Sequence, residues 1–136
     1  YFDDPNPLLT AIAAIVTGGG LVSLLVRNGD ALAMRPGLLG DWTTARDAFD
    51  RASYLNRIGV QARADQLDDL TTSLAERNLS VQAWYGVRVF TDAAATDAPV
   101  PDANQFDLLL DCEERAGHTD PYRQVAALLH VIAQRV

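Results

Sequence analysis

The residues of this sequence best suited to hold a small polar molecule are two arginines, an asparagine and two aromatic residues, namely Asn28, Arg35, Trp42, Tyr85 and Arg88. Arg88 stands in 87–90, where valines alternate with Arg88 and a phenylalanine, a pattern that favours a strand. Because an unpaired buried guanidinium is very costly, Arg88 must reach water or an anionic partner. It either holds an anionic or hydroxyl group of a ligand or forms a salt bridge to Asp111 or Glu113.

The other candidates also carry two interpretations each. Asn28, Arg35 and Trp42 follow an apolar strand, and open α/β sheets bind ligands beyond the carboxyl ends of their strands. They would form a lid with an aromatic platform and hydrogen-bonding partners. Alternatively, Trp42 docks a helix and Arg35 is solvated. Tyr85 lines the cleft or belongs to the core, and His130 is more typical of a hydrogen-bonded core histidine than of a base.

Two elements at the start of the chain must position these residues. Asn6 is suited to cap a helix with Pro7 at its first position, and apolar residues at helical spacing follow as far as Val16. Gly18 supplies a left-handed stop. The almost continuously apolar segment 21–26 predicts a parallel strand covered on both faces.

The later pattern alternates helices and strands. It predicts a short broken helix in 31–40, a helix from Asp41 to Ala52 and a polar stretch over 56–64. A helix capped by Asp65 and ended by Asn78 follows, then one or two strand pieces over 79–90 and a mobile surface loop over 91–103. The remainder is predicted as a helix over 104–116, a turn or two of helix over 121–126 and a strand over 128–133.

Composition narrows the class of protein. The chain has 136 residues with 49% hydrophobic content, which suits one domain with a real core. A net charge of −7 argues against a general nucleic-acid footprint. The single Cys112 excludes an internal disulfide and fits a reducing cytoplasm. The uncharged run 8–26 is interrupted by Gly18–Gly20, so a helix followed by a strand explains it better than a membrane span.

Several separated segments are similar to one enzyme family, the S-adenosylmethionine-dependent methyltransferases that include bacterial enzymes acting on a carboxymethoxyuridine of tRNA and many actinobacterial relatives. The matching segments are Tyr1-Phe2-Asp3-Asp4-Pro5, Gly19-Gly20-Leu21-Val22-Ser23-Leu24, Asn28, Met34-Arg35, Gly40-Asp41-Trp42, Tyr85-Gly86-Val87-Arg88-Val89-Phe90-Thr91-Asp92, Leu110-Asp111-Cys112-Glu113, Asp120-Pro121-Tyr122 and His130-Val131. Asp41 replaces the asparagine of the family pattern.

The resemblance implies a fold. It covers the C-terminal half of a class I methyltransferase domain, an α/β, Rossmann-like sheet with a helical lid insertion over about 28–64. Its last strand would be antiparallel and lie between its two predecessors. The glycine-rich turn that receives S-adenosylmethionine would lie upstream of Tyr1. Gly18–Gly20 follows a helix and precedes a strand, the reverse of a cofactor-binding turn. No cofactor-binding, catalytic or metal-binding residue is therefore assigned within the chain.

The resemblance also implies methyl transfer to an oxygen acceptor. The acidic, lysine-free composition favours a hydroxyl of a sugar or another small molecule, and the alternative acceptor is the carboxyl group of a tRNA wobble uridine. A third hypothesis is a non-catalytic fragment that acts as an association module, because half a sheet exposes an unpaired edge. We expect a cytoplasmic homo-oligomer that is inactive without the missing half.

Overall fold

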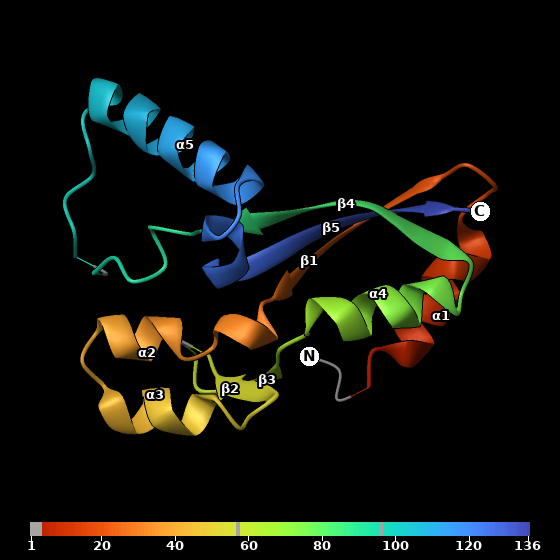
Figure 1. Cartoon of the computed structure of the whole chain (residues 1–136), viewed down its shortest axis with the longest axis horizontal. Coiled ribbons are helices and arrows are strands. Elements are labelled where there is room, and N and C mark those ends of the chain that lie inside the picture. The colour runs from red at the N-terminus through yellow and green to blue at the C-terminus, as the bar shows by residue number, and fades with distance from the viewer. Residues whose placement is uncertain (1–3, 57, 96) are drawn as a thin grey trace.

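Three strands form the main sheet of the computed structural model, which describes residues 4–56, 58–95 and 97–136. The strands β1 (Leu21–Arg27), β4 (Leu79–Val87) and β5 (Leu128–Arg135) lie in the order β1-β5-β4 (Figure 1). Since β5 is antiparallel to both neighbours, β1 and β4 run in the same direction. The predicted position of the last strand is confirmed, and the chain is a mixed α/β protein.

Helices and a small hairpin complete the described chain. They are α1 (Asn6–Ile15), α2 (Met34–Leu38), α3 (Trp42–Ala48), α4 (Leu67–Ala75), α5 (Ala103–His118), the 3-10 helices η1 (Gly29–Ala31) and η2 (Tyr122–Val125), and the antiparallel strands β2 (Ser53–Leu55) and β3 (Gln61–Arg63). None of the helices in these ranges has the length and apolar character needed to cross a membrane. Tyr1, Phe2 and Asp3 of the aromatic and acidic segment lie outside the described residues.

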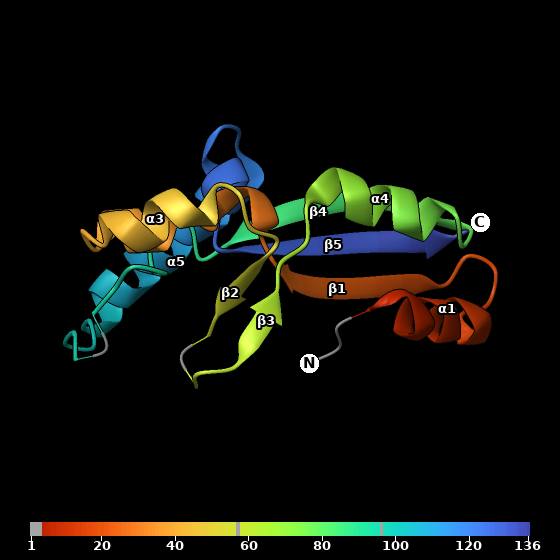
Figure 2. The same cartoon turned by 90° about the horizontal axis from the view of Figure 1, so that it is seen from below.

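The core lies between one face of the sheet and the helices α1 and α4 (Figure 2). Alternate residues of each strand point to the same face. The buried cluster consists of Leu9, Ala13, Val22, Leu70, Leu74, Leu79, Leu129, Val131 and Ala133. Burying one such leucine stabilises the fold by about 1.5–3 kcal/mol. On α4, the apolar spacing that predicted a helix therefore also marks its buried side.

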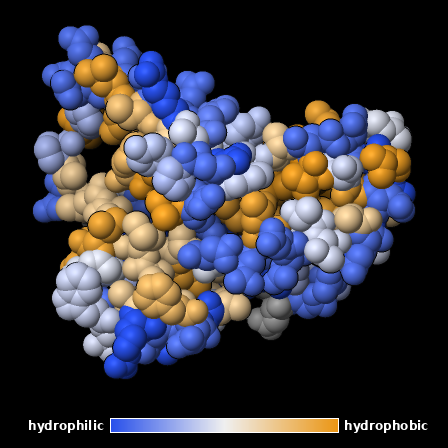
Figure 3. Space-filling view, viewed as in Figure 1, coloured by the Kyte–Doolittle hydropathy of each residue, from blue (hydrophilic) through white to orange (hydrophobic). Residues whose placement is uncertain are grey.

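The opposite face of the sheet is only partly covered. The last turn of α5 packs beside β4, whereas Leu21 and Leu25 of β1 remain 65% and 60% exposed. Figure 3 shows apolar patches reaching the surface of the molecule. The prediction that 21–26 is a parallel strand buried on both faces is therefore wrong for the described chain. In this structure β1 is an edge strand whose partner is the antiparallel β5.

Several predicted helix ends differ in detail. Asp41 caps α3 as expected, accepting the Thr44 N–H at 3.1 Å. Asn6 is instead the first residue of α1, where its side chain accepts a hydrogen bond at 2.8 Å from Arg77, which follows the end of α4. Asp65 does not cap α4, which begins after Gln66. The Asn6 side chain has a partner distant in the sequence, and the Asp65 side chain pairs with Arg63 of the adjacent strand β3. Contacts outside the helix thus override the local capping preference.

Two loops also differ from the prediction. The polar stretch 56–64 contains β3 and connects the β2–β3 hairpin. The glycine in the left-handed region after α1 is Gly19, with a φ of 79°, rather than Gly18. The strand predicted over 79–90 ends at Val87, because Arg88 adopts a φ of 61° that a strand does not allow.

Candidate functional site

Three arginines surround one aspartate beyond the ends of β1 and β4. Both terminal nitrogens of Arg27 lie 3.4 Å from Oδ2 of Asp92, and Nη2 of Arg88 lies 3.3 Å from Oδ1. Nη1 of Arg35 lies 4.0 Å from Oδ2. We call these four side chains the Asp92 cluster. Three guanidinium groups face one carboxylate, so the cluster carries two more positive than negative charges.

The secondary structure explains why these residues meet. Arg27 is the last residue of β1, and Arg88 directly follows β4. Because β1 and β4 run in the same direction, their carboxyl ends meet at one edge of the sheet. Arg35 arrives from α2, in the insertion that follows β1. This is the edge at which open α/β sheets place ligands.

The cluster is largely shielded from water. The exposed fractions of the side chains are 12% for Arg27, 13% for Asp92, 26% for Arg35 and 42% for Arg88. Charges in such surroundings are screened less by salt than surface pairs. The site is therefore able to attract a negatively charged group although the whole chain is acidic.

Glu113 of α5 holds the segment that carries the aspartate. Its carboxylate accepts the backbone N–H groups of three successive residues, Val89 at 2.8 Å, Phe90 at 3.0 Å and Thr91 at 2.9 Å. A left-handed non-glycine residue such as Arg88 costs about 1–3 kcal/mol. The hydrogen bonds to Glu113 offset that strain and fix the turn between Arg88 and Asp92.

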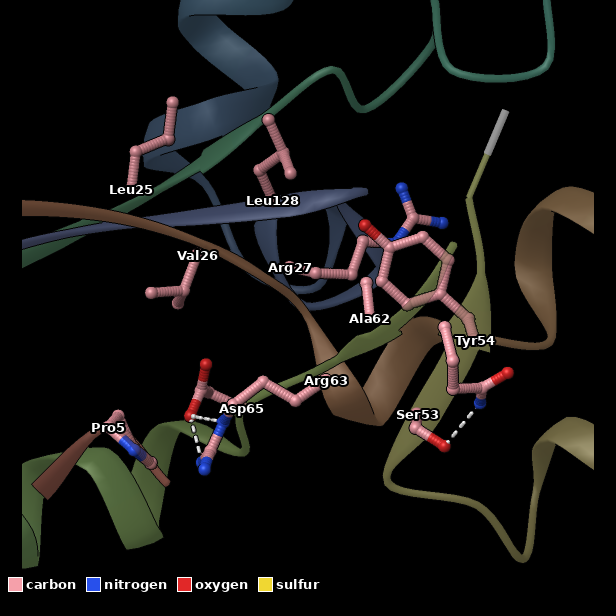
Figure 4. Close-up of a pocket in the computed structure, with 11 residues that line it drawn as sticks. Pro5, Leu25, Val26, Arg27, Ser53, Tyr54, Ala62, Arg63, Asp65 and Leu128 are labelled. Atoms are coloured by element: carbon pink, nitrogen blue, oxygen red, sulfur yellow. Dashed lines mark hydrogen bonds and ion pairs between the residues drawn. The ribbon is translucent and has the colours of Figure 1, made fainter. Parts of the chain in front are cut away.

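Two of the cavities that lie against the cluster are lined by both Arg27 and Tyr54. The hairpin cavity has a volume of about 600 Å³, and its walls include Pro5, Leu25, Arg27, Tyr54, Arg63 and Asp65. Figure 4 shows these side chains, with the Arg27 guanidinium beside the Tyr54 ring and Arg63 paired with Asp65. The donor cavity has a volume of about 320 Å³, and its walls include Arg27, Arg35, Tyr54, Asn56, Arg88 and Asp92. Arg27 and Tyr54 belong to both.

Asn28, the first predicted acceptor-binding residue, is 2% exposed. Its amide nitrogen donates to the carbonyl oxygens of Gln124 at 3.0 Å and Ala126 at 2.9 Å, and its oxygen accepts the Asp30 N–H at 3.1 Å. Both amide hydrogens are thereby used. Asn28 joins the end of β1 to the chain entering β5, and this placement positions the neighbouring Arg27 rather than a ligand.

The structure brings Arg35 and Arg88 together at Asp92, and it places Tyr85 in a separate cavity of about 630 Å³ that Arg88 also lines. Trp42 is 72% exposed on α3, beside an apolar hollow that also includes Phe49. Tyr85 lies on the open face of the sheet, with its ring 4.6 Å from the ring of His118. Neither residue lines the hairpin cavity or the donor cavity.

The alternative prediction for Arg88 was a salt bridge to Asp111 or Glu113. Arg88 does form a salt bridge, but with another residue. Arg88 pairs with Asp92, four residues later, while Asp111 pairs with Arg115 and Glu113 accepts backbone N–H groups. His130 forms the expected hydrogen bond, with Nε2 at 2.8 Å from the Ser23 hydroxyl.

Sequence reasoning missed Arg27, Asp92 and Tyr54. The first two had a signal, because each charged residue directly follows an apolar or β-forming run that ends at the same sheet edge. Tyr54 had none, since the β2–β3 hairpin was not predicted. Within the described ranges, no His, Cys, Asp and Glu side chains are grouped so that three or more could hold a metal ion.

No protein-family model matches this chain, and no curated protein matches its sequence.

Proposed function

We propose that this chain is the C-terminal part of an S-adenosylmethionine-dependent methyltransferase that methylates an oxygen of a small-molecule acceptor, most simply a hydroxyl of a saccharide. The observation that carries the proposal is the position of the Asp92 cluster, at the shared carboxyl ends of β1 and β4 with the antiparallel β5 between them. The strand order is the one that the segment resemblance implies, and the cluster lies at the edge where open α/β sheets bind ligands.

The role assigned to this chain is binding and orienting the acceptor. Methyl transfer is an in-line displacement, so alignment and exclusion of water contribute most of what the protein supplies. Arg35 and Arg88 are the candidates to hold the acceptor, because they are the more exposed arginines of the cluster. Arg27, bound to Asp92 and beside Tyr54, would form the floor between the two cavities.

The position of the turn Gly18–Gly20 supports placing the cofactor site elsewhere. The turn Gly18–Gly20 joins α1 to the start of β1, at the end of that strand opposite to the Asp92 cluster. Within the turn only Gly20 is closely packed, since a Cβ there would lie 2.8 Å from the Val16 side chain, whereas Gly18 and Gly19 face open space. We therefore propose that the cofactor binds to residues upstream of Tyr1.

Binding of S-adenosylhomocysteine, measured by calorimetry, tests the proposal. The titration is performed on the 136-residue chain and on the product of its complete gene. We expect binding by the complete product and little or none by the chain alone. If the complete product does not bind S-adenosylhomocysteine, the methyltransferase proposal is wrong.

Methyl transfer to a panel of saccharides, small carboxylates and tRNA then identifies the acceptor. Arg35→Ala should lower turnover of the true acceptor, whereas the matched variant Arg46→Ala, whose side chain is 81% exposed on α3, should not. Activity on tRNA that falls steeply with added salt would favour the wobble-uridine acceptor instead.

Self-association is the second candidate function, favoured by the exposed leucines on edge strand β1. Leu21 and Leu25 present an apolar surface beside an edge that carries unpaired backbone groups in this structure. Sedimentation of the wild-type chain and a Leu25→Glu variant tests it. A wild-type chain that remains monomeric at all concentrations would rule this function out.

A further inference from the structure

The donor cavity has an unusual wall. Among the described residues, the buried side-chain nitrogens that lack a hydrogen-bond partner are Nε of Arg27, Nη1 of Arg35 and Nδ2 of Asn56, and all three residues line this cavity. Nη1 of Arg35 is within ion-pair range of Asp92 at 4.0 Å, but that separation is too long for a hydrogen bond. The three residues that carry an unsatisfied nitrogen therefore line one cavity.

All three unsatisfied groups are donors. Leaving one buried donor without an acceptor costs about 1–3 kcal/mol, and more when the group is charged. A group that satisfied them would have to supply acceptors, and the two surplus positive charges of the cluster favour an acceptor that is negatively charged. The wall is therefore complementary to an oxyanion.

Asp92 cannot fill that need alone. Its Oδ2 receives both terminal nitrogens of Arg27 at 3.4 Å, at the long limit for a hydrogen bond, and its Oδ1 faces Arg88 at 3.3 Å. A carboxylate paired with a guanidinium in good geometry is held at about 2.7–2.9 Å through two parallel bonds. The arginines therefore retain bonding capacity for a second anion.

The rest of the wall indicates what the anion is attached to. Tyr54, Leu55, Ile58 and Leu128 supply aromatic and aliphatic surface. A volume of about 320 Å³ suits a small molecule, at the lower end of the range of ligand pockets. A planar carboxylate matches the fork of a guanidinium, and an apolar body matches the remaining wall.

We propose that the donor cavity binds a small carboxylate with an apolar or aromatic body, held by Arg35 and Arg27 and flanked by Tyr54. The inference stands without the methyltransferase proposal, because it rests on the cavity wall alone. If both proposals hold, the carboxylate belongs to the acceptor or to a ligand bound beside it.

Benzoate is the probe, and benzamide is its neutral isostere. Calorimetry or NMR titration of the 136-residue chain should detect benzoate binding and at least tenfold weaker binding of benzamide. Inorganic phosphate, which lacks an apolar body, should also bind more weakly than benzoate. Equal affinity for benzoate and benzamide would refute an anion site, and tighter binding of phosphate would refute the carboxylate assignment.

Arg35→Gln is the diagnostic variant, since it removes the charge and keeps an amide donor on a shorter side chain. We expect about tenfold to 100-fold weaker benzoate binding, the range that corresponds to a charge-assisted hydrogen bond. Arg35→Lys should restore part of the affinity. Arg46→Gln, on the adjacent helix α3 and outside the cavity, should bind as the wild type does. A folded Arg35→Gln variant with wild-type affinity would overturn the proposal.

A wild-type measurement covers the case in which Arg35→Gln does not fold. Methyl resonances of Leu55 and Leu128 and ring resonances of Tyr54 should shift when benzoate is added, while those of Leu9 in the core should not. If the resonances that shift all belong to residues outside the donor cavity, the proposal of a carboxylate site in that cavity is wrong.

Discussion

Glu113 accepts the backbone N–H of Val89 at 2.8 Å, which joins the middle of α5 to the turn after β4. The same carboxylate accepts two further backbone N–H groups, and the strained Arg88 lies immediately before them. A side chain on a helix thus determines where Arg88 and Asp92 lie. Long-range support of this kind makes the geometry of the Asp92 cluster dependent on the docking of α5.

Glu113→Gln should destabilise the chain and disturb the cluster. The glutamine amide has one acceptor oxygen and no charge, whereas the Glu113 carboxylate uses both oxygens to accept the three backbone N–H groups. At least one N–H group would therefore lose its acceptor, which lowers the free energy of unfolding by about 1–3 kcal/mol. Thermal unfolding followed by circular dichroism measures the change. Glu114→Gln is the matched control, because Glu114 is exposed and accepts no backbone hydrogen bond in the described chain. Equal melting temperatures for the two variants would contradict this assignment.

Asp92→Asn removes the carboxylate that the three arginines share. Breaking a buried ion pair by losing one partner costs about 3–5 kcal/mol, and the lower end applies here because Arg88 stays partly solvated. Urea unfolding gives the free energy. Benzoate should stabilise the variant more than it stabilises the wild type, since it would replace the lost charge. Asp97→Asn, in the exposed loop, should change neither quantity.

Gly86→Ala tests the close approach of η2 to β4. A Cβ at this position would lie 2.7 Å from Cα of Arg123 and 2.8 Å from Cβ of Ala126. Overpacking of this kind costs about 1–3 kcal/mol. Gly37→Ala on α2 is the control, since its Cβ would meet Ala45 at an ordinary 3.8 Å and alanine favours a helix. A Gly86→Ala variant as stable as the wild type would show that η2 can move away.

The ion pair of Asp120 and Arg123 predicts a pH dependence. The hydrogen bond from Arg123 holds the pKa of Asp120 below its ordinary value of 3.8. A lowered folded-state pKa means that the contribution is present above the ordinary value and is lost as the pH falls through the lowered one. Asp120→Asn should remove the stabilisation that ionised Asp120 supplies, so the melting temperature of the variant should fall less than that of the wild type between about pH 6 and pH 2. If the melting temperature of the variant falls with acidification as that of the wild type does, other carboxylates determine the acid sensitivity.

Local pattern was sufficient for the elements that bury an apolar stripe. The leucines of α4 predicted its buried face, because periodicity directly reflects burial, and 128–133 was predicted as a strand. The capping predictions at Asn6 and Asp65 were wrong for a different reason. Each side chain bonds a group outside its own helix, Arg77 for Asn6 and Arg63 of β3, two residues earlier, for Asp65, and helix-capping preferences do not weigh such partners.

The candidate site was predictable only in part. Arg35 and Arg88 were identified by residue type, but their convergence on Asp92 depends on the order of the strands and on the left-handed φ of Arg88. Asn28 was recognised as special, yet its amide is used within the protein rather than for a ligand. A sequence pattern can mark a constrained position without distinguishing structural from binding constraint.

The central place of β5 determines when the sheet can form during synthesis. β1 and β4 form no hydrogen bonds with each other, because β5 lies between them. The pairs that β5 makes with β1 join residues far apart in the sequence, such as Leu21 and Gln134. A growing chain can make α1 and α4 early, but both sets of strand hydrogen bonds must wait until 128–135 has left the ribosome. Until then, Val22 and Leu79 have no sheet to complete their burial. Such late closure slows folding and leaves apolar surface available to chaperones or to other chains.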